Sequence, residues 1–171
     1  VSLKGIDYAK ANNFRLIVAL DCGIRAVNQV DYANKKGVDF IICDHHNPVE
    51  KVPEAVAILN PKQIDCDYPY KELSGCGVGF KLIQAFSKQN NIDFSEIMEY
   101  LDLLTVSIGA DIVPMTGENR VFSFYGLQQI NKTPRVGLKA LMEIANKIKE
   151  VTITDVVFGV APRINAAGRI E

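Results

Sequence analysis

The most informative stretch for the fold is FIICDHHNPVE, residues 40–50, in which an apolar run passes directly into an acid and two histidines. A short continuous apolar run that ends in polar residues is typical of a strand buried in a parallel sheet. The two histidines are the only ones in the 171-residue chain. The sequence therefore predicts that a buried strand delivers Asp44, His45 and His46 to one edge of a sheet.

Two further stretches read as strands. FRLIVALDCG, residues 14–23, is an apolar run stopped by Asp, Cys and Gly, which suits a strand buried on both faces, and AVAILNP, residues 55–61, is a shorter run. A helix is predicted up to about Asn13, and another over residues 24–37, where apolar residues recur at three-residue steps before a glycine. The order helix, strand, helix, strand, strand predicts an α/β fold with a mainly parallel sheet and flanking helices.

The second half of the chain is predicted to be helical. DCDYPYKEL, residues 65–73, is expected to be a loop, and helical patterns follow over residues 74–89, 94–113, 118–132 and 135–150. We expect an α/β part over residues 1–115 and a helical part over residues 116–171.

Composition limits the kind of protein. The 19 basic and 20 acidic residues nearly cancel, so the chain has no overall basic field and any phosphate site must be local. The four cysteines include no CxxC pair, and we find no signal peptide and no apolar run of about 18 residues. These features predict a reduced, cytoplasmic protein without a membrane segment. Residue 1 is Val, and the last residues stop inside a patterned segment, so we expect a piece of a longer protein.

Acidic residues leave two predicted strands at the edge where parallel sheets gather ligands. Asp21 follows the first strand, and Asp44, His45 and His46 follow the second. Such a mixed oxygen and nitrogen set suits Mn²⁺, whereas Mg²⁺ prefers oxygen and Zn²⁺ more often recruits thiolates. The alternative is that Asp44 caps a turn and both histidines are ordinary loop residues. A third acid, Asp111, ends an apolar helical stretch and is costly to bury unless it is paired or metal-bound.

Other residues allow two interpretations. Gly75 and Gly77 could leave helix-terminal amides free for a phosphate or could permit close helix packing. Arg163 could make a bidentate phosphate contact or could be a solvated surface residue. We interpret Cys22 and Cys43 as small buried side chains.

The motifs VALDCG, DFIICDHHNP, SGCGVGFKL, IGADIVPMTGENR and APRINAAGR occur in an order that resembles the DHH phosphoesterase superfamily. The sequences of these motifs are most similar to the RecJ branch of that superfamily, the bacterial 5′ to 3′ exonucleases specific for single-stranded DNA. The resemblance covers nearly the whole chain. It implies hydrolysis of phosphodiester bonds in single-stranded DNA by two metal ions, Mn²⁺ or Mg²⁺. It also implies a role in DNA repair and recombination, with single-strand-binding proteins or helicases as partners.

The same resemblance implies roles for individual residues. The acid matching Asp21 bridges two divalent ions, His45 and Asp111 match metal ligands, and His46 matches a histidine that faces the scissile phosphate. Asp44 is expected to orient an imidazole. Arg163 and Asn165 match residues near the path of the DNA.

An aspartate-rich DxDG motif precedes the matching segment in that family, and a second catalytic lobe follows it. Neither occurs in these 171 residues, whose last part is then expected to begin a connector toward that lobe. We expect this chain alone to be inactive. The alternatives are another phosphoesterase of the superfamily, such as an oligoribonuclease or a pyrophosphatase, and a scaffold without catalysis.

Overall fold

The computed structural model describes residues 1–146 and 149–167, which fall into two compact units, one over residues 1–71 and one from residue 72 onward. This division differs from the predicted boundary after residue 115, which stays a prediction. Among the described residues, no helix combines the length and the apolar composition that crossing a bilayer requires.

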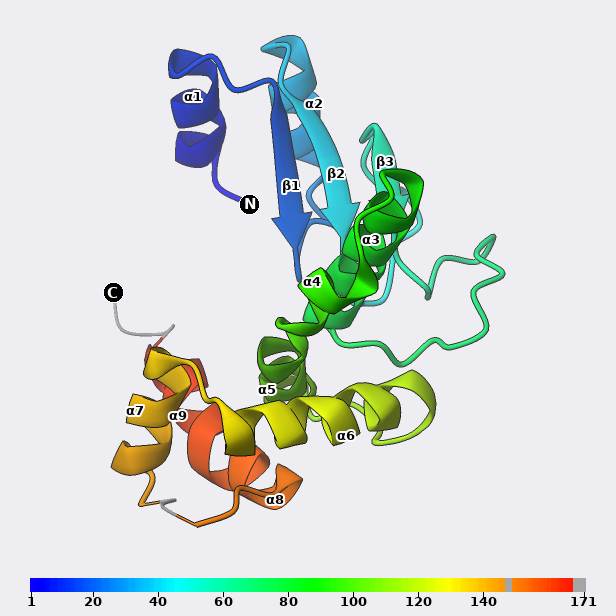
Figure 1. The fold of residues 1–171 in the computed structure, drawn as a ribbon. Coiled ribbons are helices and arrows are strands. Elements are labelled where there is room, and N and C mark those ends of the chain that lie inside the picture. Colours follow the sequence, from blue (N-terminus) through cyan, green and yellow to red (C-terminus); the bar gives the residue numbers. More distant parts are fainter. Residues whose placement is uncertain (147–148, 168–171) are drawn as a thin grey trace. The chain divides into compact units, whose positions relative to one another are not determined.

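The first unit is an α/β unit built on a parallel sheet. Its elements are α1 (Leu3–Ala11), β1 (Leu16–Leu20), α2 (Val27–Lys35), β2 (Asp39–Cys43) and β3 (Ala57–Leu59). The strand order is β1-β2-β3 and both pairings are parallel, as the arrows in Figure 1 show for β1 and β2. The predicted α/β class and parallel sheet are confirmed.

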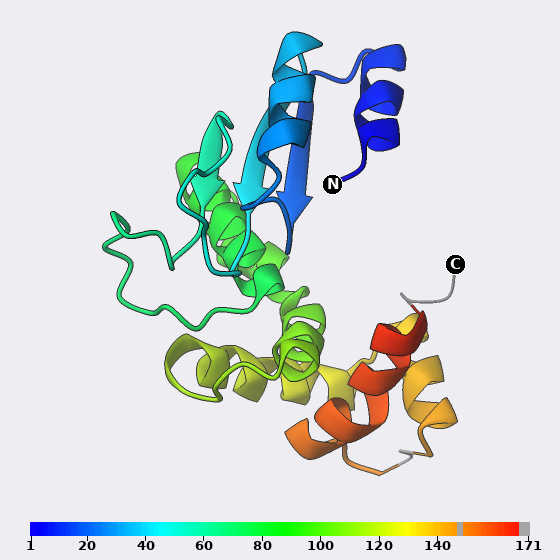
Figure 2. The same cartoon turned by 180° about the vertical axis from the view of Figure 1, so that it is seen from behind.

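One face of this sheet forms the core of the first unit. Ala19 of β1 and Phe40 and Ile42 of β2 point to that face, since residues of the same parity share a face and Ala19 pairs with Ile42. Ile6 of α1 and Val30 of α2 pack against them, both fully buried. Figure 2 shows α2 in front of β1 and β2. Apolar burial on this face therefore holds β1 and β2 in their observed register.

The prediction that β1 is buried on both faces is wrong for the described residues. Leu16, Val18 and Leu20 point away from the core just described and are 47%, 44% and 53% exposed. In the described sheet β1 pairs only with β2, so it is an edge strand. Whether a face of a strand is buried depends on the elements that pack over it, and an apolar run by itself does not reveal them.

The second unit is helical, as predicted. It contains α3 (Gly75–Gln89), α4 (Phe94–Met98), α5 (Leu101–Asp111), α6 (Gly117–Lys132), α7 (Val136–Ile144), α8 (Ile153–Asp155), a π-helical segment η1 (Val156–Val160) and α9 (Ala161–Ala167). Residues 65–73 form a loop, as expected. The sequence analysis did not anticipate η1 or α9. Apolar side chains of α5, α6, α7 and η1 form one buried cluster in this unit, including Val106, Ile130, Met142 and Val156.

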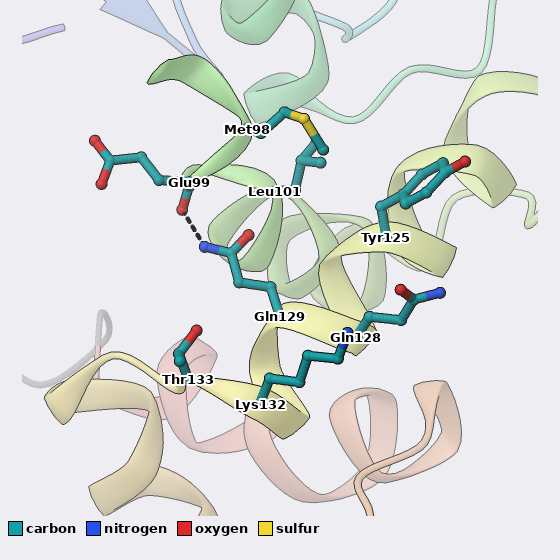
Figure 3. Close-up of a pocket in the computed structure, with 8 residues that line it drawn as sticks. All are labelled: Met98, Glu99, Leu101, Tyr125, Gln128, Gln129, Lys132 and Thr133. Carbon is teal, nitrogen blue, oxygen red and sulfur yellow. Dashed lines mark hydrogen bonds between the residues drawn. The ribbon is translucent and has the colours of Figure 1, made fainter. Parts of the chain in front are cut away.

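The helical pattern predicted over residues 94–113 is interrupted between α4 and α5. The Glu99 carbonyl oxygen accepts hydrogen bonds from Gln129 Nε2 at 2.7 Å and from Arg135 Nη2 at 2.6 Å. The first of these bonds appears in Figure 3, beside a surface pocket of about 340 Å³. Arg135 Nε also donates to the buried Asp102 carboxylate at 2.8 Å. Partners distant in sequence thus stabilise the break, which helical periodicity alone could not reveal.

A glycine permits the close crossing of α5 and α6. A Cβ atom at Gly126 would overlap the Thr105 hydroxyl and the Leu101 carbonyl oxygen. The Leu101 carbonyl is part of the backbone and cannot move aside without shifting α5. Gly137 in α7 offers the opposite case, because a Cβ there would meet no atom within 4 Å.

We predict that Gly126→Ala lowers the free energy of unfolding by about 2 kcal/mol or more, because the new methyl group forces α5 and α6 apart. Gly137→Ala is the matched control. It should raise stability by about 0.5–1 kcal/mol, since alanine costs less backbone entropy in a helix. Urea unfolding followed by circular dichroism measures both, and equal stabilities of the two variants would contradict this account of the helix crossing.

Candidate metal centre

The three strands of the first unit end in register, and each is followed by a polar residue. The pairing continues beyond the strands, because Asp21 N–H donates to the Cys43 carbonyl at 2.9 Å and Asp44 N–H donates to the Leu59 carbonyl at 3.0 Å. Leu20 pairs with Cys43, and Cys43 pairs with Leu59. Asp21, Asp44 and Asn60 are therefore neighbours at the carboxyl edge of the sheet, where parallel sheets bind ligands.

The chain turns sharply after β1, which exposes Asp21. Asp21 has a left-handed backbone with φ of 61°, a conformation that aspartate tolerates better than most residues. Gly23 has φ of 115°, and a Cβ there would lie 3.2 Å from the Ile42 side chain. Only glycine suits both conditions. The turn leaves the Asp21 side chain about half exposed, at 52%.

Asp44 is buried, with 1% of its surface exposed, and its carboxylate holds two loops together. Asp44 Oδ2 accepts the Ile24 N–H at 2.9 Å. Asp44 Oδ1 accepts the His45 N–H at 2.8 Å and the His46 N–H at 3.2 Å. The loop after β1 and the turn after β2 are thus fastened to one carboxylate.

These hydrogen bonds set the ionisation of Asp44. Burial by itself raises the pKa of its carboxyl group, but the hydrogen bonds from Ile24, His46 and His45 together outweigh burial and hold the pKa below its ordinary value. Asp44 is therefore a carboxylate at neutral pH and can only accept hydrogen bonds.

The two imidazoles contact different carboxylates. His46 Nδ1 lies 2.7 Å from Asp44 Oδ1, and His45 Nε2 lies 3.2 Å from Asp21 Oδ1. Since Asp44 only accepts, His46 Nδ1 carries a hydrogen and neutral His46 has its lone pair on Nε2. The two rings meet edge to face, with centroids 4.7 Å apart.

The donor atoms of Asp21, His45 and His46 fit a divalent metal ion. One donor atom from each of the three lies within 4.8 Å of the other two. The contact of His46 with Asp44 is of a kind common around transition metals, where a ligating imidazole gives its other N–H to a carboxylate. One oxygen and two nitrogen donors suit Mn²⁺ better than Mg²⁺.

Two residues that support this edge escaped the sequence analysis. Asn60 Nδ2 donates to the His46 carbonyl at 2.8 Å, and Arg25 donates to the Asn47 carbonyl through Nε at 3.2 Å and Nη2 at 3.1 Å. The available signal for Asn60 was its place directly after an apolar run, as with Asp21 and Asp44. Arg25 gave no comparable signal.

A pocket of about 330 Å³ opens beside the cluster. Asp21, Asp44 and His46 line it together with the loop that leads into α2. The prediction that Cys22 is buried is wrong, because Cys22 is exposed and lies along this pocket. Cys43 is buried, as predicted, and burial raises the pKa of its thiol to about 11.

The remaining predicted acid lies in the second unit. Asp111 is the last residue of α5, and its Oδ2 accepts the Gly75 N–H and the Ser107 hydroxyl, both at 3.3 Å. Asp111 thus contacts the first turn of α3. Its predicted place beside Asp21 and His45 stays a prediction.

The glycine-rich segment opens α3, as expected. The Ser74 hydroxyl accepts the Gly77 N–H at 3.1 Å, and a Cβ at Gly77 would lie 3.4 Å from the Leu73 side chain. Gly75 and Gly77 are both buried. Since the amides of both glycines have partners within the unit, this geometry favours the close-packing interpretation over a phosphate site.

The predicted substrate residues near the end of the chain lie on α9. Arg163 Nη1 donates to the Gly159 carbonyl at 2.5 Å, and Nη2 donates to the Ile144 carbonyl at 3.4 Å. Arg163 therefore joins α9 to the end of α7. Asn165 is exposed.

The chain is similar to proteins of known family. The DHH family, N-terminal domain, matches residues 3–108. The chain is 43% identical over 164 residues to a single-stranded-DNA-specific exonuclease RecJ of Bacillus subtilis, in a match that covers 95% of this chain and 20% of that protein. The chain therefore spans about a fifth of the length of this relative.

Two solved structures are also similar. The crystal structure of RecJ in complex with Mn²⁺ from Thermus thermophilus matches with a TM-score of 0.84 and 30% identity, over 98% of this chain and 25% of that one. A crystal structure of exonuclease RecJ bound to manganese matches with a TM-score of 0.83 and 30% identity, over 99% of this chain and 42% of that one.

We predict that Asp44→Asn lowers the free energy of unfolding by about 1–3 kcal/mol at neutral pH without any metal, because the amide NH₂ would face a buried N–H donor. Asp21→Asn is the matched control and should leave stability nearly unchanged, since the side chain is half exposed and asparagine tolerates a positive φ. Thermal unfolding in a chelator measures both.

The difference between wild type and Asp44→Asn should depend on pH in one direction. The folded-state pKa of Asp44 lies below its ordinary value, so its contribution is complete above about pH 4 and is lost as the pH falls through the folded-state pKa. A stability difference that grows on acidification would contradict the assigned hydrogen bonds.

Proposed function

This chain belongs to the DHH family, and from that premise we propose that it forms part of a metal-dependent nuclease that degrades single-stranded DNA from its 5′ end. The observation that carries the proposal is the cluster of Asp21, His45 and His46 at the carboxyl edge of the sheet, with Asp44 bound to His46. The named function of its relatives supplies the substrate.

Asp21 and His45 are the residues of the first unit that would hold a divalent ion, with the His46 imidazole beside them at the same edge of the sheet. Bound divalent ions would supply hydrolytic chemistry by lowering the pKa of a water molecule and stabilising charge on the phosphodiester. Mn²⁺ is the ion named for the two similar solved structures, and the donor set here suits it. Mg²⁺ remains the alternative, and two ions are proposed for the intact enzyme.

The residues around that ion have different proposed roles. Asp44 accepts the hydrogen on His46 Nδ1 and so directs His46 Nε2 away from Asp44. Nε2 can meet a phosphate oxygen only as an N–H donor, in the doubly protonated ring. We assign the phosphate-facing role to His46 because its side chain is 55% exposed, whereas that of His45 is 12% exposed and lies against Asp21. Asp111 is proposed as a further metal ligand because it matches a ligand in the family that the sequence resembles. Arg163 and Asn165 are proposed on the same ground as contacts near the DNA.

The cellular setting is part of the same proposal. We propose a role in DNA repair and recombination, in the cytoplasm, with single-strand-binding proteins or helicases as partners. All four cysteines are free, which suits a reducing compartment. The activity is that of a protein as long as its relatives, and we expect the 171 residues alone to show none.

We predict that His45→Ala, in a protein of the relatives' length that contains this sequence, lowers nucleotide release by more than about 100-fold. Even residues that only orient metal ligands cost about 10–100-fold in affinity or activity, and His45 is proposed to bind the ion directly. Asp111→Ala should have a similar effect. The assay follows a 5′-phosphorylated single strand with Mn²⁺, and Cys66→Ser, which alters a partly exposed thiol outside the cluster, is the control.

The same assay separates the alternatives. Release of mononucleotides from long strands, starting at the 5′ end, is the expected result. Activity confined to short oligoribonucleotides or pyrophosphate would indicate another phosphoesterase of the family. Full activity of His45→Ala, or wild-type protein that binds no Mn²⁺, would overturn the metal-centre proposal.

A further inference from the structure

We propose that Asn60 and Arg25 are positioning residues, which hold the turn of His45 and His46 so that His46 Nε2 faces a bound ion or substrate. The inference deepens the proposed function and rests on it for the identity of that ligand. It adds two residues from the loops on either side of the histidines, one after β3 and one after β1.

Asn60 is locked in the orientation that this role needs. It is 3% exposed, and both ends of its amide have partners. Nδ2 donates to the His46 carbonyl at 2.8 Å, and Oδ1 accepts the Lys62 N–H at 2.9 Å. A flipped amide would place a donor against the Lys62 N–H and an acceptor against the His46 carbonyl, so the surroundings permit only one orientation.

Arg25 acts on the next residue of the turn from the opposite side. Its Nε and Nη2 atoms both donate to the Asn47 carbonyl, at 3.2 Å and 3.1 Å. Arg25 directly follows Ile24, whose N–H is bound to Asp44. Two consecutive carbonyls of the turn are thus held by side chains from the loops that follow the two neighbouring strands.

This support matters because the His46 ring is itself about half exposed. Besides its edge-to-face contact with His45, the direction of the ring depends on the Asp44 contact and on the backbone that carries it. If the His46 or Asn47 carbonyl is released, the turn can rotate and His46 Nδ1 can leave Asp44 Oδ1. The ring would then no longer be restricted to the form with hydrogen on Nδ1.

The direct test is nitrogen NMR of the imidazoles, because the chain has only two histidines and their signals can be told apart. The measurement is made without metal at about pH 8.5, well above the ordinary histidine pKa of about 6.5. The variants are Asn60→Asp, which keeps the acceptor for Lys62 and loses the donor to His46, and Arg25→Gln. Arg25 is exposed, so Arg25→Gln should fold even if Asn60→Asp does not. Arg25→Lys restores a donor.

Asn34→Asp is the matched control. Asn34 Nδ2 donates to the Glu54 carbonyl at 2.9 Å, so this variant loses the same kind of hydrogen bond away from the histidine turn. It reports the effect of such a loss on stability alone. Mn²⁺ affinity, measured by electron paramagnetic resonance in the longer protein, is the second readout for all variants.

We expect His46 to carry its hydrogen on Nδ1 in wild type and in Asn34→Asp. A population of His46 with hydrogen on Nε2 should appear in Asn60→Asp and Arg25→Gln, and it should be smaller in Arg25→Lys than in Arg25→Gln. Mn²⁺ affinity should fall about 10-fold or more in Asn60→Asp and Arg25→Gln. The proposal would be overturned if Arg25→Gln kept the wild-type His46 tautomer and Mn²⁺ affinity. It would also be overturned if His46 in the wild type carried its hydrogen on Nε2. If wild type keeps Nδ1–H but binds no Mn²⁺, the metal assignment fails, and the tautomer comparison still decides the positioning role.

Discussion

The buried carboxylate of Asp44 is the interaction on which the site depends. It accepts hydrogen bonds from Ile24, His45 and His46, and so joins the end of one strand to the end of the next. Burial of a carboxylate is unfavourable without such partners, and here they lower its pKa rather than raise it. The residue between the strand and the histidines is therefore a structural anchor. The imidazoles that follow it obtain their direction from this anchor.

Different interactions stabilise the fold and the site. Apolar burial of residues such as Phe40, Ile42 and Val30 fixes the strands in register. Register then places Asp21, Asp44 and Asn60 at one edge, whatever chemistry they perform. Directed hydrogen bonds complete the arrangement at short range. This division explains why a strand can be identified from its composition, whereas a ligand must be identified from its contacts.

Much of the first unit could be predicted from sequence. The strands and the acids at their ends follow from apolar runs and from the geometry of parallel sheets, so Asp21, Asp44 and His45 were expected at one edge. Asn60 was missed because an asparagine before a proline is also typical of a turn. The open face of β1 was missed because its exposure depends on what packs over that face of the sheet, which composition does not reveal. The break at Glu99 depends on partners 30 and 36 residues away along the chain.

The central claim is that strand-end side chains of the first unit bind a divalent transition metal. Anomalous diffraction from crystals soaked in Mn²⁺ tests it most directly, because the signal locates manganese independently of any assay. The account predicts a peak within bonding distance, about 2.2 Å, of Asp21 and at least one of the two imidazoles. Strong manganese peaks at other carboxylates with none at Asp21, His45 and His46 would contradict it.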